Sequence, residues 1–365
     1  MKFNKILNCM LSALLVTSLS SAACSSLAIN DKKNNIYHGR TLELTADLPS
    51  WVTYYPKNSH FQKKTPNGEN GISYDSKYEI LAISTEVYFD GDNHNIFEGL
   101  NSAGLSFSAN MVPDAKLTTP DEKYYNKAIP VTAIGEWALA NFSTVEEVKK
   151  AVEGGYFWSP ILKNFGDLQS PLHYAFYDKK GGSIVVEAKD GKLHVYDNPT
   201  RAMTNGPDFP WHLKNLNNYS QLNNVDRSSA KLGNMMLTQP DSGIASSDLP
   251  SSDTSVGRFV RAVYYSSYAD KGDTPAEAMN TLAHVMNRFD RTKNITVDVA
   301  GESQSNNKKL ESEYTVWTSL SDLSNGVMLV RGYNEIDYTQ YSLAQFKDAN
   351  KPVFEPINTL NLTNK

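Results

Sequence analysis

The chain has 365 residues, of which 40% are hydrophobic and 21% are charged. This is ordinary globular composition, long enough for one large core or two small domains, and it excludes a disordered or fibrous protein. The formal net charge of −5 offers a phosphate backbone no broad cationic surface, so nucleic acid is not expected as a partner.

The first 23 residues have the organisation of a signal peptide. Lys2 and Lys5 form a short basic region, residues 6–19 are mostly apolar, and residues 21–23 are the small Ser-Ala-Ala that suits a cleavage site. The apolar run is shorter than the ~20 residues of a membrane-spanning helix. We therefore expect cleavage after Ala23 and a periplasmic or secreted protein with no stable membrane insertion.

Residues 24–115 have the pattern of short strands and turns. Three segments in it are rich in β-branched and aromatic residues: IYHGRTLEL (36–44), YEILAISTEVYF (78–89) and GLNSAGLSFSANMV (99–112). Glycine and asparagine separate the apolar stretches, as they do at the turns between strands. This part of the chain predicts a sheet that is partly buried on both faces.

From residue 129 to residue 152 the period changes to that of helices. Two helices are expected in succession, the second beginning near Ser143, which has capping-box spacing to Glu146. Gly154 and Gly155 are suited to end it.

The remaining segments alternate between the two patterns. A three-stranded meander is predicted at 172–198, helices at 256–269 and 275–289, and strands at 314–323 and 326–334. We see neither a repeat of fixed period nor a linker that would divide the chain. The pattern predicts a single α+β domain over 24–365, with mixed sheets and paired helices.

Cleavage after Ala23 would make Cys24 the first residue of the mature chain. Its α-amine, with an ordinary pKa of ~7.7 to 8.0, could then take the proton of the thiol on the same residue. The thiolate would attack an amide, form a thioester and release an amine, and water would hydrolyse the thioester. Such a site also needs an oxyanion hole and a cation near the sulfur.

Seven stretches of the chain carry a resemblance to a known family. They are Cys24-Ser25, Gly39-Arg40, GLNSAGL (99–105), ANFSTVEEVKKAV (140–152), SIVVE (183–187), MTNGPDFPWHLKNLNNY (203–219) and GRFVRA (257–262). Together and in this order, the sequence resembles the choloylglycine hydrolase family of N-terminal nucleophile hydrolases, which contains bile salt hydrolases and penicillin V acylases. The resemblance implies a four-layer αββα sandwich of two antiparallel sheets between helical layers, and a homotetramer.

The resemblance also implies roles for individual catalytic residues. Cys24 corresponds to the nucleophile, Arg40 to the cation beside its sulfur, and Asn205 to the side-chain amide of the oxyanion hole. Arg258 corresponds to a second arginine that orders the polar site. Glu43 stands where the family usually has an aspartate that binds the α-amino group, one methylene longer than the family residue.

A backbone N–H is implied as the second oxyanion donor, in contact with the substrate. An ungapped alignment places it at Met111, whereas the asparagine that is common in the family would favour the neighbouring Asn110. Neither a metal nor an organic cofactor is expected, because the seven histidines form no HExxH motif and no cysteine cluster accompanies them.

The sequence thus favours an exported amidohydrolase that cleaves a linear, non-peptide amide of a small molecule. The leader favours the type that acts on penicillin V or N-acyl homoserine lactones. Hydrolysis of conjugated bile salts is the alternative within the class. From a different class, Cys24 could be a lipoprotein cysteine that anchors a binding protein, although residue 21 is serine where a lipobox prefers leucine.

Overall fold

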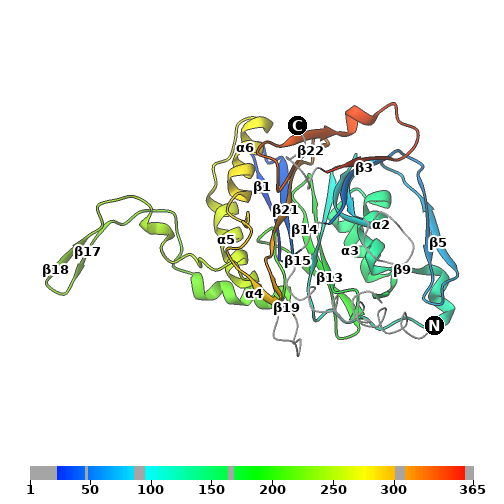
Figure 1. Cartoon of the computed structure of the whole chain (residues 1–365), viewed down its shortest axis with the longest axis horizontal. Coiled ribbons are helices and arrows are strands. Elements are labelled where there is room, and N and C mark those ends of the chain that lie inside the picture. Colours follow the sequence, from blue (N-terminus) through cyan, green and yellow to red (C-terminus); the bar gives the residue numbers. More distant parts are fainter. Residues whose placement is uncertain (1–22, 46–47, 86–94, 163–167, 301–308, 358–365) are drawn as a thin grey trace.

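The computed structural model describes residues 23–45, 48–85, 95–162, 168–300 and 309–357. Apart from Ala23, the expected signal peptide lies outside these residues. Figure 1 shows four layers, in the order helices, sheet, sheet, helices. This arrangement confirms the αββα sandwich.

The first large sheet, called sheet A, contains strands from near the beginning and near the end of the described chain. Its order is β16 (Ala202–Met203), β1 (Cys24–Asn30), β2 (Ile36–Leu44), β21 (Tyr314–Asp322), β22 (Val327–Gly332) and β23 (Thr339–Ser342). All neighbouring strands are antiparallel. β1 therefore lies beside the short edge strand β16, which brings residues near 204 to Cys24.

The second large sheet, sheet B, is antiparallel as well and contains the predicted meander. Its order is β15 (Lys192–Asp197), β14 (Ser183–Lys189), β13 (Leu172–Asp178), β8 (Leu105–Met111), β7 (Asn95–Asn101), β6 (Ile80–Thr85), β3 (Ser50–Tyr55) and β24 (Val353–Pro356). The strand-rich segment at 99–112 contains the end of β7, a turn and β8, and Gly104 adopts a φ of 89° where the chain reverses.

Helices cover the outer face of each sheet. α5 (Ser255–Tyr268) and α6 (Pro275–Met286) pack on sheet A, whereas α2 (Ile134–Asn141) and α3 (Val145–Glu153) pack on sheet B. α4 (Phe209–Asn215) follows β16 closely. The capping box of α3 is formed by Thr144 and Glu147, one residue later than predicted, since it is the Thr144 side chain that accepts the Glu147 N–H.

Smaller elements complete the described chain. Paired strands are β4 (His60–Lys64) with β5 (Asn70–Asp75), β9 (Ala128–Pro130) with β10 (Tyr156–Trp158), β11 (Ile161–Leu162) with β12 (Leu168–Gln169), β17 (Ser229–Leu232) with β18 (Met235–Thr238) and β19 (Asp298–Ala300) with β20 (Lys309–Glu311). Short 3₁₀ helices are η2 (Glu122–Lys127), η3 (Val131–Ala133), η5 (Leu216–Tyr219), η6 (Ile244–Ser246) and η7 (Leu343–Phe346).

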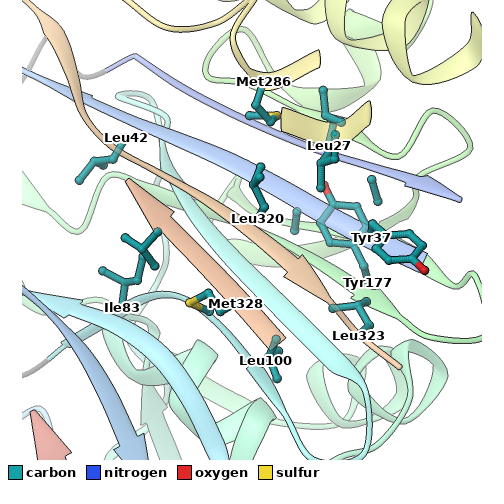
Figure 2. Close-up of a cluster of buried hydrophobic side chains, with 14 of the residues drawn as sticks. Leu27, Tyr37, Leu42, Ile83, Leu100, Tyr177, Met286, Leu320, Leu323 and Met328 are labelled. Atoms are coloured by element: carbon teal, nitrogen blue, oxygen red, sulfur yellow. The ribbon is translucent and has the colours of Figure 1, made fainter. Parts of the chain in front are cut away.

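The main core fills the space between the two sheets and continues under α5 and α6. Figure 2 shows both parts: Leu27 and Leu320 of sheet A lie on the side of Met286 of α6, whereas Leu42 and Met328 of sheet A lie toward Ile83 and Leu100 of sheet B. A second core lies between sheet B and helices α2 and α3. Burial of these apolar side chains at roughly 25 cal/mol per Å² is the main force that holds the layers together.

One glycine sets the approach of α6 to sheet A. A Cβ atom on Gly39 of β2 would lie 2.7 Å from Met286 Cγ and 2.8 Å from its Sδ. Only glycine lets the helix lie this close to the strand that carries Arg40. Within the described residues, no helix is both long and apolar enough to cross a membrane.

The hairpin of β17 and β18 projects away from the sandwich, as Figure 1 shows. Its strands pair only with each other. It exposes Leu232, Met235, Met236 and Leu237, each at least 40% accessible. We call this hairpin the arm.

Candidate active site

Cys24 begins β1, on the face of sheet A that is turned toward sheet B. It is 1% exposed and is a free thiol. Ala23 still precedes it, so its nitrogen is a peptide N–H, and this N–H donates to Asn205 Oδ1 at 2.8 Å. The register of β1 with β16 pairs Ser26 with Met203, and its continuation brings Asn205 opposite Cys24.

Arg40 of β2 reaches the sulfur from the neighbouring strand. Its Nη2 lies 3.7 Å from Cys24 Sγ and also donates to the carbonyl of Ala109, while Nη1 donates to the carbonyl of Phe97 at 3.1 Å. The guanidinium is completely buried and lies over the ring of Trp317, 4.9 Å from its centroid. Two carbonyls and one ring thus fix a cation beside the thiol.

Arg258 enters the site from the first turn of α5. Its Nη2 donates to Asn205 Oδ1 at 2.7 Å, and its Nη1 donates to the Cys24 carbonyl and, at 2.8 Å, to Ser25 Oγ. It is 1% exposed. The structure therefore brings Cys24, Arg40, Asn205 and Arg258 together in one cluster, and their catalytic roles stay predictions.

Met111 and Asn110, at the end of β8, make different contacts. Asn205 Nδ2 donates to the Met111 carbonyl at 2.8 Å, whereas the buried Asn110 side chain donates to the Thr204 carbonyl at 2.8 Å. In an extended strand, the N–H and C=O of one residue point to the same side. The Met111 N–H therefore points toward Asn205, and the Asn110 N–H points away from it.

Glu43 does not bind the Cys24 nitrogen in this structure. Its carboxylate accepts a hydrogen bond from Thr315 Oγ1 at 2.9 Å, and its backbone N–H donates to the Ala23 carbonyl at 2.9 Å. Burial raises the pKa of Glu43 to about 7, although Arg258 opposes the shift. Its predicted role at the amine of a mature chain stays a prediction.

Glu313 is a site residue that sequence reasoning missed. Its carboxylate accepts a hydrogen bond from the backbone N–H of Ala23 and forms an ion pair with Arg291. The residue is 5% exposed. The residue directly precedes the predicted strand at 314–323, and no sequence signal there indicates that it lies beside Ala23, at the expected cleavage position.

Neighbouring groups have opposing effects on the pKa of the Cys24 thiol. Burial raises the pKa of Cys24, Arg40 and Arg258 lower it, and Glu43 raises it further. Behind Arg40, burial lowers the pKa of His38 to about 3 and raises the pKa of Glu98 to about 8. Near neutral pH both of these groups are largely uncharged, so the charge of Arg40 is left to act on the sulfur.

A cleft of about 1200 Å³ opens beside this cluster. Its lining includes Met111, whose carbonyl accepts from Asn205, and Pro207 of the same turn, together with Trp211, Lys116 and Lys189. A volume of this size admits a bulky small molecule. Among the residues that the structure describes, no three His, Cys, Asp or Glu side chains are grouped as a metal site would require.

The αββα sandwich, with a cysteine at the start of β1, has the fold of the N-terminal nucleophile hydrolases. The family model described as "Linear amide C-N hydrolases, choloylglycine hydrolase family" matches residues 24–353. The chain therefore belongs to the choloylglycine hydrolase family, and it is an enzyme of the linear amide C–N hydrolase class.

Relatives of two kinds are similar to this chain. A bile salt hydrolase/transferase from Clostridium perfringens is 30% identical over 326 residues, which cover 88% of this chain and 94% of that protein. A penicillin V acylase from Pectobacterium atrosepticum is 26% identical over 260 residues, covering 69% and 62%. The crystal structure of a variant of the conjugated bile acid hydrolase from Clostridium perfringens superposes with a TM-score of 0.77 at 26% identity, covering 93% of this chain and all of that one.

Proposed function

We propose that this protein hydrolyses the amide bond of conjugated bile salts through a thioester on Cys24, after export and removal of residues 1–23. The observation that carries the catalytic part is the cluster of Cys24 with Arg40 and Asn205, in which the sulfur lies 3.7 Å from a buried guanidinium. No other cysteine follows the leader, so the nucleophile has no rival thiol.

The chemistry follows from the contacts of Cys24. Once the peptide bond to Ala23 is cut, the nitrogen becomes an amine that takes the thiol proton. The sulfur attacks the substrate carbonyl, and the resulting oxyanion is stabilised by the Asn205 amide and the Met111 N–H. The amine returns the proton to the departing nitrogen, and water then cleaves the thioester. Arg40 favours the thiolate throughout.

The substrate class is proposed from the relatives and from the cleft. Relatives named for bile salts match the chain over nearly their full length, whereas the penicillin V acylase is matched over 62% of its length. This reverses the preference that the leader alone gave to penicillin V and N-acyl homoserine lactones. The cleft of about 1200 Å³ is compatible with a steroid amide.

The burial of Cys24 speaks against a lipid anchor. An acylated cysteine would carry its chains from a sulfur that is here enclosed beside Arg40, with its residue 1% exposed. A blocked amine would also be unable to act as the base. We therefore favour export as a free periplasmic or secreted enzyme over the anchored binding protein.

We also propose that the enzyme self-associates, with a homotetramer as the expected state. The arm supports this proposal, because an isolated two-stranded hairpin is only marginally stable in water. Its apolar side chains need a partner surface to be buried.

The function is tested with a panel of glycocholate, taurocholate, penicillin V and N-acyl homoserine lactones. We expect the two bile salts to be hydrolysed fastest, and Cys24→Ser to be exported but to lose hydrolysis of every amide. Cys9→Ser is the matched control, because Cys9 is removed with the leader. Hydrolysis by Cys24→Ser would refute the nucleophile, and faster turnover of penicillin V than of both bile salts would refute the substrate class.

A further inference from the structure

The turn that carries Asn205 has a second set of contacts, in addition to those of Asn205 with Cys24 and Met111. Residues 204–208 join β16 to α4 without regular structure of their own. Asn205 must nevertheless be held accurately, because its amide contacts both the nitrogen of Cys24 and the carbonyl of Met111. The turn therefore needs support from outside.

Much of this support comes from a buried pair in sheet B. His173 of β13 and Glu187 of β14 are 1% and 2% exposed, and their Nδ1 and Oε1 atoms are 2.8 Å apart. His173 Nε2 lies 3.0 Å from the Thr204 carbonyl. Glu187 accepts the Phe209 N–H at 3.1 Å on Oε1 and 3.0 Å on Oε2. The pair thus holds the turn on both sides of Asn205.

The hydrogen-bond partners of His173 determine which of its ring nitrogens carries a hydrogen. A carbonyl oxygen can only accept, so His173 Nε2 must carry a hydrogen and donate it to Thr204. The other ring nitrogen faces Glu187, so one proton is shared between the imidazole and the carboxyl group. The ring is therefore fixed in orientation by its two partners, as a group that orients another side chain should be.

We propose that His173 and Glu187 are positioning residues for the oxyanion hole, acting through the backbone of residues 204–209 to place the Asn205 amide. Neither residue has a hydrogen bond to Cys24, Arg40 or the Asn205 side chain, and of the two only Glu187 also lines the cleft. Their removal should weaken stabilisation of the oxyanion and leave the thiol unchanged. This inference rests on the proposed function, in which Asn205 binds the oxyanion.

Two amide variants of His173 separate its two hydrogen bonds. In His173→Gln the side-chain nitrogen lies where Nε2 was and keeps the bond to Thr204, whereas in His173→Asn it lies where Nδ1 was and keeps only the bond to Glu187. We expect His173→Asn to lower kcat for glycocholate about tenfold or more, below the 10²–10³ reported for loss of an entire oxyanion donor. His173→Gln should stay within about threefold of the native enzyme, by the same scale.

The control is a buried ion pair that lies far from the turn in sequence. Lys63 and Glu136 lie 2.9 Å apart, and Glu136→Ala should lower the melting temperature without lowering kcat. For all variants, KM and the rate of Cys24 alkylation by iodoacetamide are measured as well. A positioning role predicts that kcat changes while KM and alkylation do not, because alkylation forms no oxyanion.

Equal kcat values for His173→Asn and His173→Gln would overturn the inference, as would a fall in alkylation parallel to the fall in kcat. If either variant does not fold, Glu187→Ala replaces it, with the same expected loss of kcat and unchanged alkylation. Failure of the proposed function is distinguished by the native enzyme, in which Cys24 would then not be alkylated or its alkylation would leave hydrolysis intact.

Discussion

The charge beside the Cys24 sulfur is the feature of single residues on which the chemistry depends most. In Arg40→Ala the thiol keeps its burial, which raises its pKa, but loses the cation 3.7 Å away that lowers it. We expect a higher thiol pKa and slower alkylation by iodoacetamide at neutral pH, with about 1.36 kcal/mol for each unit of pKa. An alkylation pH profile that superposes on that of the native enzyme would contradict this role.

For single residues, the sequence is informative where a residue stands in a recognisable motif. Cys24, Arg40, Asn205 and Arg258 stand in motifs, and the structure brings them together. Glu313 and the pair of His173 with Glu187 could not be found in this way, because their contacts are made across strands far apart in sequence. Asn110 and Met111 are distinguished as candidate backbone donors only by the direction in which their N–H groups point, and this direction depends on the strand register.

Elements were predictable where their pattern is local. The bounds of β2 agree with the predicted strand at 36–44, and α6 begins at Pro275, where the predicted helix begins. The strand predicted at 78–89 is β6 as far as Thr85, and its last residues lie outside the described chain. α4 was missed because its seven residues follow a turn rich in Gly, Pro and Asp.

The arm is the element whose apolar side chains are most exposed. Leu232, Met235 and Leu237 share one face of the hairpin, since Leu232 pairs with Met235 and Ala230 with Leu237. Replacing all three by serine should reduce the molar mass in sedimentation from that of a tetramer toward that of one chain. Lys231→Ser on the opposite face is the control and should leave the mass unchanged. A monomeric native enzyme would refute self-association.

On the scale of the whole molecule, the pH dependence of stability follows from buried groups between the sheets. Glu98 contacts His38 at 3.2 Å and faces Arg40. Burial raises the pKa of Glu98 from 4.5 to about 8, so the folded state binds its proton more tightly than the unfolded state. This stabilisation is complete below pH 4.5 and is lost as the pH rises through 8.

His38 has the opposite sign, since burial lowers its pKa from 6.5 to about 3 and its contribution is lost only as the pH falls below 6.5. Between pH 6.5 and 8 the contribution of His38 to stability is therefore constant and that of Glu98 decreases. The loss of the Glu98 contribution should lower the free energy of unfolding by at most about 2 kcal/mol. Urea unfolding should show a smaller fall for Glu98→Gln. An equal fall in both proteins would show that Glu98 does not titrate in this range.

The account as a whole depends on a mature chain that begins with an unmodified Cys24. The most direct measurement is the intact mass of the exported protein, taken before and after reaction with iodoacetamide while glycocholate hydrolysis is followed. We predict a chain that starts at Cys24 with a free amine, gains a single carbamidomethyl group on that residue and loses hydrolysis in proportion. A different first residue, a lipid adduct at Cys24 or hydrolysis that survives complete alkylation would contradict it.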